Sequence, residues 1–221
     1  MEVQPLAQDE YAELKTLGLD GGLVYQETYH EGCYARHHLR GNKQDFFWRL
    51  ETPDRLGRAG IDKIGLGALI GLSDSWRVDC YLLAEHLLWL QQHYWQSRYS
   101  VSFPRLRPCA GGITPASLMN ERELVQTICA FRLLMPEVEL SLSTRESPWF
   151  RDRVIPLAIN TVSAFSRTQP GGYADGNPEL EQFATHDGRR PEEVAAALVK
   201  AGLQPVWKDW DSFLGRGSQH S

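Results

Sequence analysis

Residues 61–95 decide the fold class, because they join a strand pattern to a long helix pattern. The stretch begins with IDKIGLGALIGL (61–72), an apolar run that passes into a glycine-rich loop, and continues with WRVDCYLLAEHLLWLQQHYW (76–95). Apolar residues recur at helical spacing in the second segment, and Asp74 or Ser75 can cap its start. We therefore predict a strand followed by a helix whose core-facing residues are Val78, Tyr81, Leu82, Ala84, Leu88 and Leu90.

The same alternation of short apolar runs and amphipathic segments extends along most of the chain. Strands are predicted at 21–29, 61–72, 99–103, 138–143 and 159–165, and helices at 52–60, 76–95, 120–135, 147–158 and within 189–210. Strands that are separated by helices form parallel sheets with right-handed crossovers. The predicted class is therefore α/β.

Composition and charge restrict the possible partners. The chain has 221 residues, of which 42% are hydrophobic and 23% charged, and this is enough apolar material for one sizeable core. A net charge of -5 does not favour nucleic acid or an anionic membrane surface as a partner. Since no targeting signal and no membrane-length apolar run is visible, we expect a cytoplasmic protein.

Cysteines and histidines do not form a metal-binding pattern in the sequence. The four cysteines are Cys33, Cys80, Cys109 and Cys129. Because no pair has C-x2-C spacing, neither a zinc site nor a disulfide framework is indicated. The adjacent residues His37 and His38 lie in the basic segment ARHHLRGNK (35–43), which we interpret as a mobile loop rather than a metal site.

A polar segment follows each predicted strand, where a parallel sheet places its ligand-binding loops. The five segments are QETYH (26–30), GLGALIG (65–71), PRLRP (104–108), STRES (143–147) and SRTQPGGY (166–173). The glycine run lacks the G-x-G-x-x-G spacing of a dinucleotide site, and a single arginine is more often a surface ion pair. Five such segments at one edge of a sheet nevertheless predict a site for carboxylate and hydroxyl groups, with arginine as a bidentate clamp.

Seven segments carry a resemblance to a known family. They are VYQETYH (24–30), YARHHLRGNK (34–43), RLETPDRLGRAGIDKIGLGALIGL (49–72), HYWQSRYSVSFPRLRPC (93–109), LSLSTRES (140–147), RTQPGGY (167–173) and PVWKDWDSFLGR (205–216). At this spacing the chain resembles the C-terminal portion of the tyrosine lyases of thiamine biosynthesis, in the radical S-adenosyl-L-methionine (SAM) superfamily. The resemblance implies a partial (β/α) TIM-type barrel of about five C-terminal units at 1–175 and a C-terminal extension of the biotin and thiamin synthesis associated type at 176–221.

The resemblance also implies a reaction and its partners. In that family a 4Fe-4S cluster cleaves SAM reductively to a 5'-deoxyadenosyl radical, which takes a hydrogen atom from tyrosine. The Cα–Cβ bond of tyrosine then breaks to give 2-iminoacetate and p-cresol, and thiazole synthase receives the 2-iminoacetate. The family's C-x3-C-x2-C cluster motif is missing here, so the cluster ligands and the first barrel strands are expected outside this chain. We therefore expect the chain to need that N-terminal part as a partner for activity.

Residue roles are implied in the same way. The resemblance assigns Gln26, Glu27 and Arg49 to cofactor binding, and it places Gly65 and Gly67 where the backbone approaches adenine. It assigns the tyrosine carboxylate to Arg145, with Ser143, Ser163 and Arg167 as neighbours, and it assigns no metal ligand to this chain. Phe165 departs from the family, which usually has glycine at that position.

Two other interpretations stay open. The chain could be a half-barrel that binds tyrosine or thiazole synthase without chemistry. A cluster-independent barrel lyase or aldolase is a third class, but it would need a lysine in an apolar pocket at a strand's carboxyl end. Lys63 begins its predicted strand and therefore lies at the opposite end.

Overall fold

The computed structural model describes residues 1, 4–107, 113–167 and 185–207. Within them, five parallel strands form one sheet in the order β1-β2-β3-β4-β5. The strands are β1 (Gly21–Leu23), β2 (Lys63–Gly67), β3 (Arg98–Ser102), β4 (Glu139–Leu142) and β5 (Thr161–Val162). The sheet curls into a half-barrel, which confirms the predicted α/β class and partial barrel.

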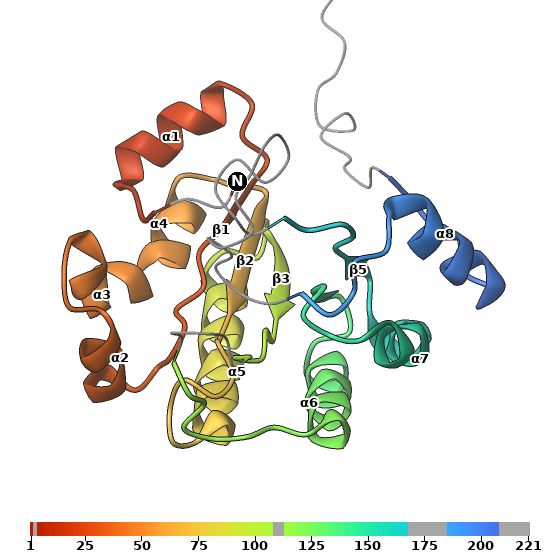
Figure 1. Cartoon of the computed structure of the whole chain (residues 1–221). Coiled ribbons are helices and arrows are strands. Elements are labelled where there is room, and N and C mark those ends of the chain that lie inside the picture. Colours follow the sequence, from red (N-terminus) through yellow and green to blue (C-terminus); the bar gives the residue numbers. More distant parts are fainter. Residues whose placement is uncertain (2–3, 108–112, 168–184, 208–221) are drawn as a thin grey trace, which may run out of the picture.

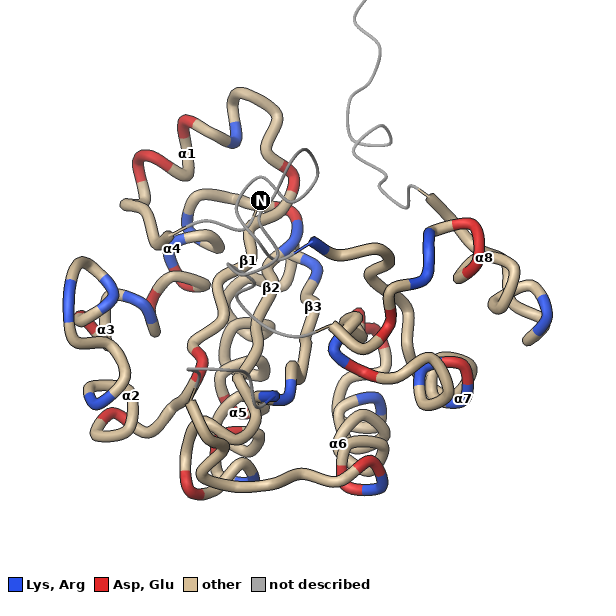
Figure 2. The backbone as a smooth tube through the Cα atoms, viewed as in Figure 1, with Lys and Arg blue, Asp and Glu red and all other residues tan. Residues whose placement is uncertain are grey.

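Helices follow one another around the sheet in chain order. They are α1 (Gln8–Thr16), α2 (Glu31–His37), α3 (Phe46–Leu50), α4 (Thr52–Arg58), α5 (Trp76–His93), α6 (Glu121–Leu134), α7 (Pro148–Ala158) and α8 (Pro191–Lys200), with a 3-10 turn η1 (Asn42–Gln44). Figure 1 shows α4, α5, α6 and α7 one after another around the outside of the strands, with α8 beyond α7. Basic and acidic residues are interspersed along these helices (Figure 2). Helices α4 to α8 all begin and end within their predicted ranges.

The core lies between the sheet and these helices. Alternate strand residues such as Ile64, Val101 and Leu140 are buried in it, together with Leu87 of α5 and Leu124 of α6. This alternation arises because successive side chains of a strand point to opposite faces of the sheet. The other face of the sheet lines the inside of the half-barrel.

Small and polar side chains line that inner face. Ser100, Ser102 and Ser141 border an open space of about 440 Å³. Complete barrels usually fill their interior with bulky branched residues, so these small side chains leave room at the centre. At the amino end of the strands, Nζ of Lys63 donates hydrogen bonds of 2.6 and 2.7 Å to the carboxylate oxygens of Glu139.

The buried face of α5 differs from the predicted one. Val78 and Tyr81 are 50% and 63% exposed, whereas the buried residues of the helix are Trp76, Asp79, Cys80, Leu83, Leu87 and Leu90. The prediction was wrong for Val78 and Tyr81 and confirmed for Leu90, while Ala84 and Leu88 pack against the core. The two errors arise because apolar residues occupy more than one side of this helix. Helical periodicity alone therefore did not determine which side packs on the sheet.

The prediction of a basic loop at 35–43 was wrong for its first residues, which belong to α2. Helix α2 runs to His37, and its first turn is capped by His30, whose side chain accepts a 3.0 Å hydrogen bond from the Cys33 backbone N–H. The ring of His38 stacks on that of Tyr34 at 4.0 Å. The Tyr34 hydroxyl donates to the carbonyl oxygen of Lys43 at 2.7 Å. These contacts order the segment from His30 to Lys43.

Candidate functional site

Glu27 follows β1 at the carboxyl end of the sheet and is held by two neighbours. Its Oε1 accepts a 3.0 Å hydrogen bond from Nη2 of Arg49, and its Oε2 lies 3.1 Å from Nε2 of His38. Arg49 also donates from Nε to the carbonyl oxygen of Tyr25 at 2.8 Å. The Glu27 side chain stays 23% exposed, so its oxygens can still accept hydrogen bonds from hydroxyl groups. The structure thus brings together Glu27 and Arg49, two residues assigned from the sequence, and adds His38.

Gln26 lies on the other side of the strand. Its side chain is 4% exposed, and neither Nε2 nor Oε1 has a hydrogen-bond partner among the described residues. It adjoins Tyr29, Arg49 and His86 in a small space behind the sheet. Glu27 does not line this space, so Gln26 and Glu27 do not form one binding surface here.

Gly65 and Gly67 make room for the side chains of Leu23 and Tyr25, at and just after β1. A Cβ at Gly65 would lie 2.4 Å from Cγ of Leu23, and one at Gly67 would lie 2.7 Å from the Tyr25 ring and 2.9 Å from the Ser102 carbonyl oxygen. Packing alone therefore requires glycine at both positions. Their predicted role beside adenine stays a prediction.

We expect Gly65→Ala to destabilise the chain by about 1–3 kcal/mol, because the added methyl group overlaps Leu23. Urea unfolding followed by circular dichroism measures this loss. Adding Leu23→Ala should recover part of it, whereas Gly188→Ala serves as the control because no atom lies within 4 Å of its added Cβ. Equal effects of Gly65→Ala and Gly188→Ala would contradict the packing requirement.

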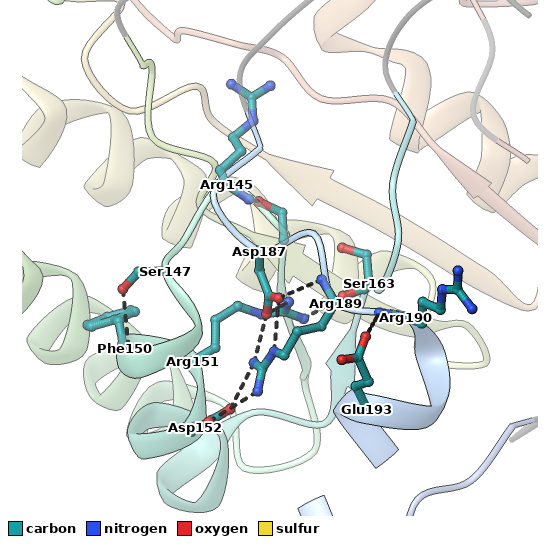
Figure 3. Close-up of polar contacts among 11 residues, drawn as sticks. Arg145, Ser147, Phe150, Arg151, Asp152, Ser163, Asp187, Arg189, Arg190 and Glu193 are labelled. Carbon is teal, nitrogen blue, oxygen red and sulfur yellow. Dashed lines mark hydrogen bonds and ion pairs between the residues drawn. The ribbon is translucent and has the colours of Figure 1, made fainter. Parts of the chain in front are cut away.

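Arg145 and Ser143 share the turn after β4. The Arg145 backbone N–H donates to Oγ of Ser143 at 3.3 Å, and Nη1 of Arg145 lies 3.5 Å from the carbonyl oxygen of Arg105. Figure 3 shows the Arg145 guanidinium pointing away from the ion pairs around Asp187. Arg145 is half-buried at the carboxyl end of the sheet, the edge at which parallel sheets place their ligand-binding loops.

Ser163 and Arg167, after β5, have different surroundings. The carbonyl oxygen of Ser163 accepts a hydrogen bond from Nη2 of Arg151, which ties the end of β5 to α7. The Arg167 guanidinium lies 4.4 Å from the centre of the Phe165 ring. Phe165 has a φ of 54°, a left-handed conformation that favours glycine. This conformation gives a physical reason for the glycine that the family usually has there.

Glu146 was missed by the sequence analysis although it organises the loops after β3 and β4. It is 2% exposed and accepts hydrogen bonds of 2.8 Å from Nε of Arg105 and from Nη2 of Arg107. Arg105 also donates to the carbonyl oxygen of Met119 at 2.8 Å. The arginines of the PRLRP segment are therefore engaged within the protein, and the only sequence signal for this was an acidic residue beside Arg145.

The thiols of the described residues do not fit a cluster-binding site. Burial raises the pKa of Cys33, which lies in α2, and raises that of Cys80 in α5 to about 12. Cys129 lies in α6, and Cys109 falls outside the described residues. No three His, Cys, Asp or Glu side chains converge as a metal site in the part of the chain that the structure describes. Nor does any helix there have the length and apolar character needed to cross a membrane.

These features together define a class of protein. Parallel strands, outer helices and polar loops at the carboxyl ends make a half-barrel of the (β/α) type, with a carboxylate and an arginine at its rim. A family model described as "Biotin and Thiamin Synthesis associated domain" matches residues 102–204.

Two curated relatives match nearly the whole chain. Over 219 residues the chain is 85% identical to 2-iminoacetate synthase of Escherichia coli K12 and 82% identical to 2-iminoacetate synthase of Salmonella typhimurium LT2. The alignments cover 99% of this chain but 58% of each relative, so the chain spans less than two thirds of their length. The predicted resemblance to the C-terminal portion of 2-iminoacetate synthase is thereby confirmed.

Solved structures agree with the barrel assignment. The FeFe-hydrogenase maturase HydG aligns with a TM-score of 0.83 at 32% identity. This alignment covers 91% of the present chain and 44% of the HydG chain. Methylornithine synthase aligns with a TM-score of 0.66 at 18% identity over 91% of this chain and 56% of its own. At that identity the second match supports the fold alone.

Proposed function

We propose that this chain is the C-terminal portion of a radical SAM tyrosine lyase of thiamine (thiazole) biosynthesis. The whole enzyme would act in the cytoplasm, cleave the Cα–Cβ bond of tyrosine to 2-iminoacetate and p-cresol, and pass 2-iminoacetate to thiazole synthase. The observation that carries this proposal is the 85% identity to 2-iminoacetate synthase over 99% of the chain. The division into barrel at 1–175 and extension at 176–221 belongs to the same proposal.

The residues of this chain would bind and orient the reactants. Bound SAM would supply the 5'-deoxyadenosyl radical. The Glu27 carboxylate, held by Arg49 and His38, suits the two hydroxyl groups of a ribose, because carboxylate oxygens accept hydrogen bonds strongly. Arg145 would bind the tyrosine carboxylate bidentately, with Ser143, Ser163 and Arg167 nearby.

The cluster and the remaining strands would come from the missing N-terminal part. Cys33, Cys80 and Cys129 do not converge on one point in the described part of the chain, which supports a cluster held by residues outside it. At the outer edge of β1, the Leu23 backbone N–H donates to the carbonyl oxygen of Met1 at 2.9 Å. Backbone hydrogen bonding at this edge is what a preceding barrel strand would continue.

The alternatives differ in what the chain does alone. A non-catalytic half-barrel would bind tyrosine or thiazole synthase without the missing part. The aldolase alternative has less support, because Lys63 is paired with Glu139 at the amino end of the strands. A lysine in an ion pair is a poor nucleophile for a Schiff base.

The test compares the chain alone with a completed enzyme, in which the part of the Escherichia coli relative that this chain does not cover is joined before Met1. Both are reconstituted anaerobically with iron and sulfide and supplied with SAM, a reductant and tyrosine. We expect the completed enzyme to form p-cresol and 5'-deoxyadenosine, and the chain alone to hold no stable cluster and form neither product. A stoichiometric cluster in the chain alone, lost in Cys33→Ala, would contradict the proposal. Tyrosine binding by the chain alone, with no products from the completed enzyme, would favour the non-catalytic alternative.

A further inference from the structure

We propose that Asp79, on α5 behind the sheet, is the positioning residue that fixes Glu27 at the rim. This inference rests on the proposed function, in which Glu27 binds the ribose of SAM. Asp79 does not reach the rim itself. It acts through the two residues that follow Glu27 in the chain.

Asp79 accepts hydrogen bonds directly from that segment. Its Oδ1 accepts from Oγ1 of Thr28 at 2.9 Å and from the backbone N–H of Tyr29 at 2.7 Å. Asp79 is 1% exposed and Thr28 is completely buried, so water does not compete for these bonds. A carboxylate acceptor makes them stronger than bonds between neutral groups.

Glu27 needs such an anchor because its backbone is strained. Its φ is 72°, and only one other non-glycine residue of the described chain, Phe165, has a positive φ. A non-glycine residue in this conformation is strained and persists only where its surroundings impose it. On one side the Glu27 carbonyl oxygen accepts a 2.7 Å hydrogen bond from Leu69, and on the other side Asp79 holds Thr28 and Tyr29.

A second contact between α5 and the same segment supports this arrangement. The Tyr29 hydroxyl lies 3.0 Å from Nδ1 of His86. His86 lies about two turns further along α5 than Asp79, on the same side of the helix. Burial lowers the pKa of His86 to about 4, so its ring is neutral at pH 7 and can accept a hydrogen bond from the Tyr29 hydroxyl. Two residues of one rigid helix thus hold the segment from Thr28 to Tyr29.

Asp79 also joins this segment to the loops after β2 and β3. Its Oδ2 accepts a hydrogen bond from Oγ of Ser73, in the loop after β2. The Ser73 carbonyl oxygen in turn accepts a 2.7 Å hydrogen bond from Oγ of Ser117, which precedes α6. The position of Glu27 is therefore set relative to the neighbouring rim loops through a single carboxylate.

The experiment measures SAM affinity and tyrosine turnover in the completed enzyme for three variants. Asp79→Ala removes every acceptor and should raise the SAM dissociation constant about tenfold or more, because hydrogen bonds to a charged acceptor are stronger than those between neutral groups. Asp79→Asn keeps an oxygen for Thr28 and Tyr29 and should restore most of the affinity. The matched control is Asp74→Ala, because Asp74 is an exposed carboxylate in the loop just before α5. This change should leave SAM affinity and tyrosine turnover unchanged.

A purely structural role would give a different result. If Asp79 positions Glu27, the Michaelis constant for tyrosine at saturating SAM stays unchanged while SAM affinity falls. Unchanged SAM affinity in Asp79→Ala, or an equal loss for SAM and tyrosine that Asp79→Asn does not restore, would overturn the inference. SAM binding without products by the unaltered completed enzyme would overturn the proposed function but not the role of Asp79. Absence of SAM binding by that enzyme would overturn both.

Discussion

Asp187→Ala should lower the free energy of unfolding of the chain by about 3–5 kcal/mol, because it leaves a buried guanidinium without its carboxylate. Arg151 and Asp187 are both almost fully buried, and Nη1 of Arg151 donates to Oδ2 of Asp187. Arg189 donates to the same carboxylate from Nε at 2.9 Å and from Nη2 at 2.7 Å (Figure 3). Urea unfolding followed by circular dichroism measures the loss.

This network matters for the rim because Asp187 lies directly behind it. The backbone N–H groups of His186 and Asp187 donate to the carbonyl oxygen of Thr144 at 2.9 and 3.0 Å, next to Arg145. Burial alone would raise the pKa of Asp187, but hydrogen bonds and charge from Arg189 and Arg151 lower it below the usual value of 3.8. The stabilisation is therefore complete above that pH and is lost as the pH falls through the lowered pKa.

Asp152→Ala is the matched control for Asp187→Ala. Asp152 also accepts hydrogen bonds from Arg189, at 2.9 and 3.1 Å, but its side chain is 40% exposed. Exposed ion pairs contribute about 0–1 kcal/mol, so this change should have little effect. Combining Arg151→Met with Asp187→Leu should recover much of the stability, because an apolar pair leaves no buried charge. Equal losses for Asp187→Ala and Asp152→Ala would show that burial does not govern this network.

Arg145→Lys in the completed enzyme should weaken tyrosine use by about 10–100-fold while SAM affinity stays the same. A planar guanidinium can donate two parallel hydrogen bonds to a carboxylate, and a lysine ammonium cannot reproduce that geometry. The loss corresponds to about 1.5–3 kcal/mol for hydrogen bonds between charged groups. Steady-state kinetics with tyrosine, together with SAM binding by equilibrium dialysis, measures both quantities.

Arg153→Lys is the control for this substitution. Arg153 lies on α7 with its guanidinium 4.2 Å from the centre of the Trp149 ring, and Trp149 is 58% exposed. Arg153→Lys should leave the kinetics with tyrosine and the affinity for SAM unchanged. If Arg145→Lys reduced SAM affinity and tyrosine use equally, Arg145 would not be a substrate residue.

The sequence predicted the elements well because their signals are local. Strand ranges such as 61–72 and 138–143 contain β2 and β4, and the helix range 120–135 contains α6. Capping residues and apolar periodicity act within a few residues of the chain, so they can be read from it directly. Helix α2 was not predicted because its N-cap is His30, and histidine is an unusual residue at that position.

The sequence by itself determined the order of strands and helices, the α/β class and the resemblance that the comparisons confirm. Only the tertiary structure decided that Glu27 meets Arg49 and His38 while Gln26 turns away, and that Asp187 reaches Arg151 across 36 residues. It also decided that Val78 and Tyr81 of α5 face outward and Asp79 inward. The physical reason is range: periodicity and caps depend on neighbours in the chain, whereas buried ion pairs and the packed face of a helix depend on which distant segments fold against one another.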